Sequence, residues 1–341
     1  MARNQKKVAV MGLLGLLLAW GVGAIATAQS KTLIIYSGRS EKLIGNLIQK
    51  AEEDLGIDIE VRYGKTAQLA IAIQEEGRNS KADLFFGQDA GALGSLAKEK
   101  RTVPIPSDLL NKVDSKFRSP DGQWIGISGR ARVVDYNTKL VTNPSELPSS
   151  IWELTDPKWR GKVGWAPTNG SFQSFITAMR LTAGDAKTLE WLKAMKANGT
   201  KVYPKNTPIV EALGRGEIEL GLVNNYYLYR FTKDKPDFPV AHHYMPGDVG
   251  SMINVAGVAI VDTTDQQGDA EKFVRYLLND SSQNYFAQKT KEYPLVKGIP
   301  APANQMSISQ INPPDIDLSN LDDLEGTLKL LGDEEEGAGL L

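Results

Sequence analysis

The sequence predicts an α/β protein made of two doubly wound lobes with a cleft between them. Three observations support this class. The 341 residues suffice for two domains of ordinary size. Short runs rich in β-branched and aromatic residues alternate with helical patterns, which is typical of largely parallel sheets covered by helices. The alternation occurs in two blocks, on either side of a Pro- and Ser-rich stretch at residues 142–150.

Residues 1–28 are predicted to be a secretory signal peptide rather than part of either lobe. Three basic residues precede an apolar run at 8–25, and small residues ending at Ala28 would allow cleavage before Gln29. An uncleaved membrane anchor is the alternative, because the apolar run approaches the length that spans a bilayer.

The first block predicts one complete lobe in the order β-α-β-α-β-α. The expected strands are 32–36, 57–63 and 83–86, and the helices that follow them are 41–55, 66–77 and 90–100. Residues 124–137 are then expected to hold two β runs about a turn at Ser128-Gly129, leading into the 142–150 stretch as a crossing between lobes.

The second block predicts the other lobe and a return to the first. It holds expected strands at 162–166, 202–204 and 217–223 and expected helices at 171–183, 187–198 and 207–214. A strand at 254–261 and a helix at 269–278 complete the first lobe. The amino-terminal lobe is therefore expected to comprise 29–130 plus about 254–302, and the carboxyl-terminal lobe 131–253.

Residues 303–341 are expected to form a separate terminal segment. Leu321, Leu324, Leu328 and Leu331 recur at helical spacing and predict an amphipathic helix. Residues 332–341, which include the acidic run 333–336, follow it and are expected to be a frayed tail.

Composition excludes several classes of chemistry. The chain has no cysteine, which excludes thiolate metal sites, iron-sulfur clusters and cysteine nucleophiles. Its only histidines, His242 and His243, are adjacent, so a multi-histidine metal site is disfavoured. A formal net charge of -2 argues against a nucleic-acid partner. A transition metal would therefore have mainly oxygen ligands, which directs attention to the 11 tyrosines.

Tyr226 and Tyr227 directly follow the predicted strand 217–223. Ligands bind at the carboxyl ends of strands in open α/β sheets, and a turn or new helix at that point would let adjacent side chains converge. The alternative is that the two rings only pack in the core. The functional interpretation is a pair of phenolates on a hard cation such as Fe(III), because a phenol ionises at neutral pH only beside strong positive charge.

Other strand ends could bind an anion or a third phenolate. Tyr36 and Arg39 follow the first expected strand, and Tyr63 ends the second. Asn169, Gly170 and Ser171 open a helix after strand 162–166, where free backbone amides would attract an anion. Taken singly, each of these could be an ordinary helix cap.

Enzyme signatures are absent from the sequence. No G-x-G-x-x-G follows the first strand, no Walker lysine occurs, and Ser128 lacks a G-x-S-x-G elbow. A hydrolase or transferase in the same cleft is therefore the least favoured hypothesis, and a non-enzymatic binding protein is expected.

Residues 32 to about 296 resemble the periplasmic ferric iron-binding proteins that serve ABC transporters. The shared motifs, in family order, are YSGR, SGRARVV, DPKWRGKVGWAPTNGSF, LVNNYYLYR and KEYPL. The resemblance implies a bilobal type II periplasmic binding-protein fold with iron in the cleft. It implies Tyr226 and Tyr227 as core ligands, an anion loop at Asn169, Gly170 and Ser171, and Asn206 with Asn224 or Asn225 as helpers.

The chain departs from the family at three possible ligand positions. Ser40 stands where some members have histidine, Gln88 where others have glutamate, and Gly170-Ser171-Phe172 where others have tyrosine. We therefore expect Tyr63 or, less favoured, Tyr36 to supply a third phenolate, with carbonate or another small synergistic anion held against Arg39.

The expected function is the periplasmic substrate-binding component of an iron ABC transporter. It would act as a monomer, bind ferric iron through tyrosine phenolates with a synergistic anion, and deliver the metal to an inner-membrane permease. The alternative is a protein of the same fold that binds an anion or a phosphorylated small molecule without metal.

Overall fold

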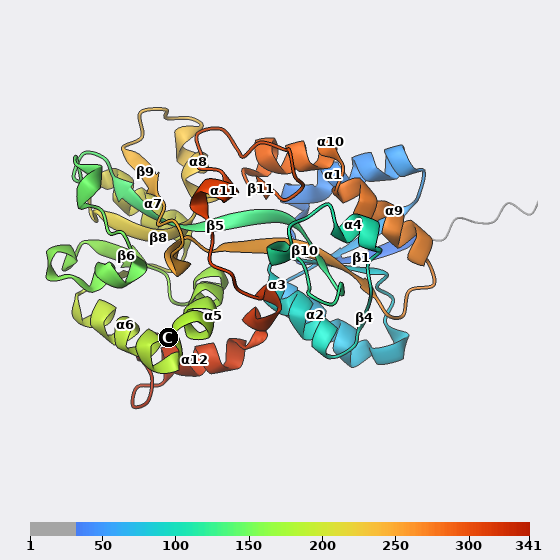
Figure 1. Cartoon of the computed structure of the whole chain (residues 1–341), viewed down its shortest axis with the longest axis horizontal. Coiled ribbons are helices and arrows are strands. Elements are labelled where there is room, and N and C mark those ends of the chain that lie inside the picture. Colours follow the sequence, from blue (N-terminus) through green and yellow to red (C-terminus); the bar gives the residue numbers. More distant parts are fainter. Residues whose placement is uncertain (1–31) are drawn as a thin grey trace, which may run out of the picture. The chain divides into compact units, whose positions relative to one another are not determined.

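The computed structural model describes residues 32–341, so the predicted signal peptide at 1–28 lies outside the described residues. Two sheets make up this part of the chain, and they share one long strand, β5 (Ile125–Asn137). The strand order along the joined sheets is β2-β1-β3-β10-β5-β8-β6-β7 (Figure 1). No helix within residues 32–341 has the length and apolar character needed to cross a membrane.

The first lobe has a mainly parallel sheet covered by helices on both faces. Its elements are β1 (Leu33–Ser37), α1 (Glu41–Leu55), β2 (Ile59–Tyr63), α2 (Thr66–Glu76), β3 (Leu84–Gly87), α3 (Ala90–Lys98), β4 (Thr102–Val103), α4 (Ser107–Leu110), β10 (Ile253–Val261), α9 (Gln267–Leu277), α10 (Asp280–Tyr285) and β11 (Tyr293–Pro294). β1 pairs in parallel with β2 and β3, whereas β10 runs antiparallel to β3. The predicted β-α order of this lobe is confirmed.

The second lobe repeats this plan on a smaller sheet. Its elements are β6 (Val163–Trp165), α5 (Gly170–Ala183), α6 (Asp185–Ala197), β7 (Lys201–Val202), α7 (Asn206–Arg215), β8 (Leu220–Asn224), α8 (Tyr226–Thr232) and β9 (Val240–His243). β6 pairs in parallel with β7 and β8, and β8 pairs antiparallel with β5. The aromatic rings of Trp165, Phe172 and Trp191 pack edge to face in its core, with centroids 5.7 and 6.1 Å apart.

β5 passes from one lobe to the other without interruption. The predicted turn at Ser128-Gly129 is wrong, because these residues pair with β11 inside a continuous strand. The strand packs closely there, since a Cβ on Gly129 would lie 3.1 Å from side-chain atoms of Ile253 and Leu295 and these side chains would have to shift. The partner of β5 changes from β10 at Ala131 to β8 at the next residue. β5 therefore connects the two sheets, while the lobe limits at 130/131 and 253/254 stay a prediction.

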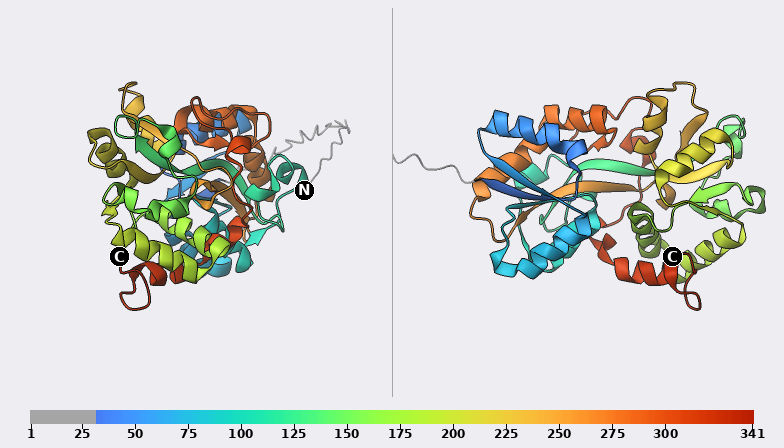
Figure 2. Two further views of the ribbon diagram at one scale, coloured as in Figure 1. Left: turned by 60° about the vertical axis from the view of Figure 1, so that its left-hand side comes forward. Right: turned by 180° about the vertical axis from the view of Figure 1, so that it is seen from behind.

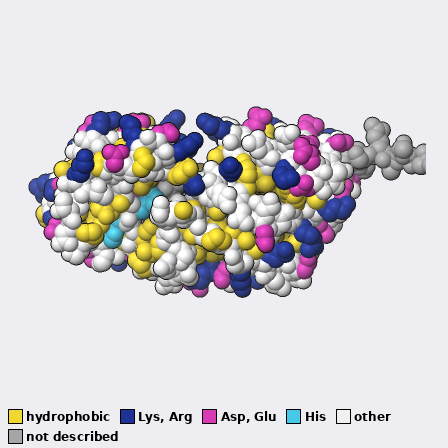
Figure 3. All heavy atoms as spheres, turned by 90° about the horizontal axis from the view of Figure 1, so that it is seen from above, with side chains coloured by type: hydrophobic (Ala, Val, Ile, Leu, Met, Phe, Trp, Pro, Cys, Tyr) yellow, Lys and Arg dark blue, Asp and Glu magenta, His cyan; other side chains and the backbone are white. Residues whose placement is uncertain are grey.

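Local sequence explains the helix positions. In α1 the apolar residues Ile44, Leu47, Ile48 and Ala51 recur at helical spacing and are buried, and the helix ends at Gly56 in the left-handed conformation, with φ of 64°. The charged residues of this helix lie on its outer face. Over the face of the molecule seen in Figure 3, basic and acidic side chains are mixed rather than separated.

The terminal segment, residues 303–341, contacts both lobes. It contains α11 (Ile308–Ile311), a 3₁₀ turn (Leu318–Asp322) and α12 (Leu324–Gly332). The 3₁₀ turn packs on α3 of the first lobe, and α12 packs on α5 and α6 of the second. Figure 2 shows α12, in red, beside the green helices of the second lobe.

The expected frayed tail is wrong. Lys196 Nζ donates to the carbonyl oxygens of Ala338 and Gly339, each at 3.0 Å, and the Ala338 amide donates to the Leu330 carbonyl at 2.9 Å. The tail therefore folds back onto α12, because its backbone carbonyl and amide groups form hydrogen bonds with Lys196 and Leu330. The predicted helix is also shorter than expected, since Leu321 lies in the preceding 3₁₀ turn.

Candidate metal and anion site

A cavity of about 950 Å³ lies between the two lobes, at the carboxyl ends of strands β1, β3, β6 and β8. Helices α2 and α3 line it from the first lobe, and α5 and α8 from the second. The turn before α12 borders the same cavity. This location is where ligands bind in open α/β sheets.

Tyr226 and Tyr227 both line this cavity. β8 ends at Asn224 and α8 begins at Tyr226, so the chain turns into a helix at the pair. The two rings stack with centroids 4.5 Å apart and planes inclined by 29°. Burial and the neighbouring Tyr227 raise the pKa of Tyr226 above its ordinary value. Its phenol is therefore neutral at pH 7 unless a strong positive charge binds beside it.

The predicted anion loop opens onto the same cavity. Asn169 Oδ1 caps α5 by accepting from the Ser171 amide at 3.0 Å and from Ser171 Oγ at 2.7 Å. Asn206 Nδ2 donates to Ser171 Oγ at 3.3 Å. Asn169, Gly170 and Ser171 all line the cavity, and apart from the adjacent residues and the α5 backbone no atom lies within 4 Å of the position that a Gly170 Cβ would take. The start of α5 is thus accessible to an anion.

Two arginines on β5 belong to the site and were not predicted. Arg130 is buried, lines the cavity and donates to the Gln88 carbonyl, and its charge lowers the pKa of Tyr226 against the larger effect of burial. Two residues later, Arg132 faces the same side of the strand and donates to Asn224 Oδ1 at 3.4 Å. Their spacing in the motif SGRARVV could have indicated them, since a strand presents every second residue to one face.

Arg132 is a buried cation without a carboxylate partner in the described chain. Its guanidinium lies over the rings of both Phe172 and Phe175, at 5.4 and 5.1 Å from their centroids. Its Nε and Nη2 have no hydrogen-bond partner. Burial lowers the pKa of Arg132 to about 9. This side chain and Arg130, together with Asn224 and Ser171, line a small second cavity.

Arg39 does not face the cavity as predicted. Both of its terminal nitrogens donate to the carboxylate of Glu292, each at 2.6 Å, and the side chain is buried. Its charge is therefore neutralised inside the first lobe. Glu292 itself borders the cavity and also accepts from Ser128 and Thr290. The positive charge next to the tyrosines comes instead from Arg130 and from Arg230, whose guanidinium lies 4.8 Å from the centre of the Tyr227 ring.

The side chain of Asn225 is also occupied by hydrogen bonds to other parts of the chain. Its Oδ1 accepts from the Ala131 amide at 2.9 Å, and its Nδ2 donates to the Lys291 carbonyl at 3.1 Å and to Gln305 Oε1 at 2.7 Å. These contacts hold together three distant parts of the chain. Asn224, the other residue that the resemblance allowed, keeps an unpaired Nδ2 beside Arg132.

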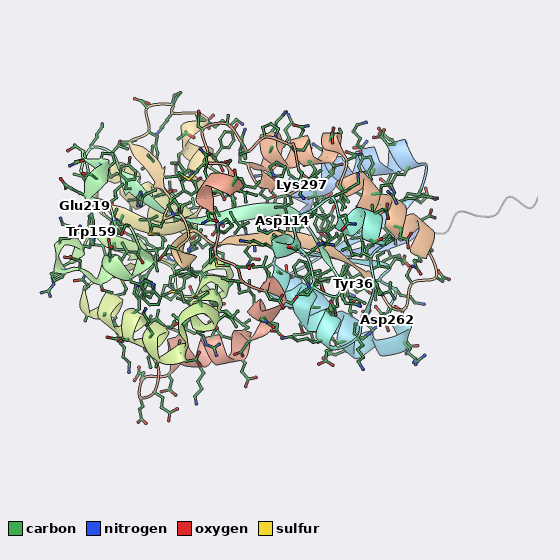
Figure 4. All side chains as sticks on the ribbon, viewed as in Figure 1. Tyr36, Asp114, Trp159, Glu219, Asp262 and Lys297 are labelled. Atoms are coloured by element: carbon green, nitrogen blue, oxygen red, sulfur yellow. The ribbon has the colours of Figure 1, made fainter. Side chains whose placement is uncertain are left out.

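The structure does not bring Tyr36 or Tyr63 to the tyrosine pair. The Tyr36 hydroxyl donates to Glu76 of α2 at 3.1 Å, with Arg62 lying 4.6 Å above its ring. Figure 4 labels Tyr36 within the first lobe. Tyr63 ends the outermost strand, β2, and is 36% exposed. Neither residue lines the cavity.

A two-lobed α/β fold with a polar cleft at its strand ends defines a substrate-binding protein. Residues 79–316 match the family of bacterial extracellular solute-binding proteins. The chain belongs to this family, and its fold is the type II periplasmic binding-protein fold.

Individual relatives are similar over most of the chain. "Iron uptake protein A1" of Synechocystis is 32% identical over 282 residues, covering 80% of this chain and 78% of that protein. The crystal structure of iron-bound HitA from Pseudomonas aeruginosa superposes with a TM-score of 0.79 at 29% identity, covering 87% and 97% of the two chains. A Trichodesmium protein in complex with iron and citrate gives 0.77 at 29% identity, covering 88% and 98%. The resemblance to ferric iron-binding proteins is confirmed.

Proposed function

We propose that this protein is the periplasmic substrate-binding component of an iron ABC transporter and binds ferric iron in the cleft between its lobes. The observation that carries the proposal is the stacked pair Tyr226 and Tyr227 at the end of β8, lining the cavity. The names of the similar proteins support iron as the cargo. The protein would act by binding, without catalysis.

The chemistry of the donors suits ferric iron. Phenolate oxygen is a hard ligand, and a tripositive ion supplies the charge that the two phenols need in order to lose their protons. Ferric iron with two phenolates remains positive, so an anion completes the site. Carbonate or another small anion would bind at the start of α5, near Arg130 and Arg132, rather than at Arg39 as the sequence suggested.

Closure and release follow from the connection between the lobes. β5 and β10 pair with each other in the first lobe, and β5 continues into the second. Bending of β5 near residues 133–136 and of β10 near residues 254–258 would bring the first lobe over the tyrosine pair, and the closed monomer would dock on an inner-membrane permease. Opening of the lobes, loss of the anion or reduction of the iron would release it.

A visible spectrum tests the proposal. Ferric phenolates absorb visible light, so the wild-type protein mixed with ferric citrate and bicarbonate should turn orange-red. The double variant Tyr226→Phe, Tyr227→Phe should stay colourless. Tyr229→Phe is the matched control, because Tyr229 lies on the same helix but is exposed and outside the cavity. A colourless wild type that still binds inorganic phosphate would favour the metal-free anion-binding alternative.

A further inference from the structure

We propose that Asn225 is a positioning residue for the metal site: its side chain sets the turn that presents Tyr226 and Tyr227 and connects this turn to β5 and to the first lobe. The inference rests on the proposed function, that is, on ferric iron at the two tyrosines. It adds a residue that acts through its neighbours and contributes no ligand of its own.

The side chain of Asn225 takes the place of a backbone group in the ladder between β8 and β5. Arg132 lies opposite Asn224 in this ladder, so Asn225 stands where the next residue would pair with Ala131. The Asn225 amide donates to the Ala131 carbonyl at 3.0 Å, as in a continued strand. The return bond, from the Ala131 amide, is accepted by Asn225 Oδ1 at 2.9 Å, where a continued strand would use the backbone carbonyl.

This replacement lets the chain leave the sheet at the point where the tyrosines begin. Asn225 has helical backbone angles, with φ of -51° and ψ of -40°, and α8 starts at Tyr226. A carbonyl in the helical conformation points along the helix axis, so it is directed away from the neighbouring strand. Without the side-chain oxygen, the buried amide of Ala131 would lose its acceptor, which is costly.

The other end of the same side chain joins this turn to two further segments. Asn225 Nδ2 donates to the Lys291 carbonyl at 3.1 Å and to Gln305 Oε1 at 2.7 Å. Lys291 lies in the loop before β11, and its Nζ is 4.3 Å from the centre of the Tyr229 ring on α8. Asn225 is fully buried, so water does not compete for these bonds. The loop of the first lobe therefore contacts α8 at two points.

Asn225 is bonded to β5 at the residue where that strand changes partners. Ala131 pairs with Ile253 of β10, whereas the next residue pairs with β8. The region of β5 that is proposed to bend begins two residues later, at Val133. Both Ala131 and Lys291 lie on the first-lobe side of this region. The turn before Tyr226 is therefore anchored to the first lobe, although α8 belongs to the second, and a change in the angle between the lobes must act on this turn.

Two variants test the role of this side chain, with ferric citrate in bicarbonate as the probe. Adjacent phenolates bind one ion only when both oxygens converge, and a binding site tolerates errors of only about 0.5 Å. We expect Asn225→Ala to lower the affinity for iron about tenfold or more and to shift the visible phenolate band. Asn225→Asp keeps the oxygen that accepts from Ala131 and loses the Nδ2 donor, so its affinity should lie between those of Asn225→Ala and the wild type.

Asn198→Ala is the matched control for general destabilisation. Asn198 is also buried, its Nδ2 donates to the carbonyls of Leu154 and Asp156 at 3.3 and 3.0 Å, and it lies outside the cavity. Urea unfolding should show that this variant is destabilised, while its iron affinity and visible band stay those of the wild type. An equal loss of affinity in the two alanine variants, or wild-type affinity and band in Asn225→Ala, would overturn the positioning role alone.

Gln305→Met serves if Asn225→Ala does not fold. It removes only the acceptor at 2.7 Å, from a half-buried side chain in the terminal segment. We expect its iron affinity to fall about threefold, and an affinity equal to that of the wild type would count against the inference. Absence of the phenolate band in the wild-type protein would overturn the proposed function itself.

Discussion

Asp322 and Asp323 are adjacent in the sequence and pair with basic side chains of opposite lobes. Asp322 Oδ1 lies 2.7 Å from Lys98 Nζ on α3, and Asp323 Oδ2 lies 2.9 Å from Arg180 Nη2 on α5. The terminal segment thus connects the lobes at a point separate from β5 and β10, and Asp322 also lines the cavity. Any change in the angle between the lobes must therefore move or release this segment.

Gly94→Ala should detach the terminal segment from the first lobe. A Cβ at this position would come 2.2 Å from the Ser319 carbonyl oxygen, which is backbone and cannot rotate away. We expect a loss of about 1–3 kcal/mol in the free energy of unfolding and faster cleavage of the segment in limited proteolysis. Gly45→Ala in α1 is the control, because its Cβ meets only the flexible Glu41 side chain. Equal behaviour of the two variants would refute the docking of this segment.

Glu292→Gln should destabilise the first lobe strongly. It would leave Arg39 buried without its carboxylate, which costs about 3–5 kcal/mol in the free energy of unfolding. Asp269→Asn, in the exposed pair with Lys272, should cost less than about 1 kcal/mol. Urea unfolding measures both. Similar losses would mean that the Arg39 pair contributes no more than a surface contact.

The Arg39–Glu292 ion pair also predicts how the free energy of unfolding depends on pH. Burial alone would raise the pKa of Glu292, but Arg39 and the Thr290 hydroxyl outweigh it and hold the pKa below the ordinary 4.5. The unfolded chain therefore binds the proton more readily than the folded one. The stabilisation is present above about pH 4.5 and is lost as the pH falls through the folded value. Acid titration of wild-type unfolding, with Glu292→Gln showing a smaller dependence, checks this sign.

Iron binding should release protons from both tyrosines. Tyr226 is neutral at pH 7, because a phenol ordinarily has a pKa of about 10 and burial together with Tyr227 raises the pKa of this one further. If both phenols bind as phenolates, about two protons leave for each iron bound. An indicator dye in weakly buffered solution measures the release, and Tyr227→Phe should release about one proton fewer. The same count in the wild type and in this variant would argue against phenolate ligation by Tyr227.

Arg132→Met should stabilise the iron-free protein while weakening iron binding. The guanidinium is buried against Phe172 and Phe175 without a carboxylate, so an apolar side chain of similar size is expected to raise the free energy of unfolding by about 1–4 kcal/mol. Affinity for ferric iron with bicarbonate should fall, because a positive charge next to the anion is lost. Arg39→Met is the contrasting control and should destabilise, since it leaves Glu292 unpaired. A destabilised Arg132→Met protein with normal affinity would contradict both expectations.

Local patterns explain which predictions succeeded. Helix and strand positions depend on the spacing of apolar residues along a short stretch, and the predicted elements lie within a few residues of the observed ones. Tyr226, Tyr227 and the Asn169 to Ser171 loop each follow a strand directly. Their place at the cleft follows from the rule that parallel strands end at one edge, without knowledge of any distant contact.

The sequence alone was sufficient for the fold class and for the position of Tyr226 and Tyr227 directly after a strand, because these depend on composition and on neighbouring residues. Which charged side chains pair with each other was decided only by the tertiary structure. Arg39 meets Glu292 across 253 positions, and that contact leaves Arg130, Arg132 and Arg230 as the cations near the tyrosines. A buried charge takes whichever partner packing brings within hydrogen-bond distance, and packing joins residues whose separation in sequence carries no local signal.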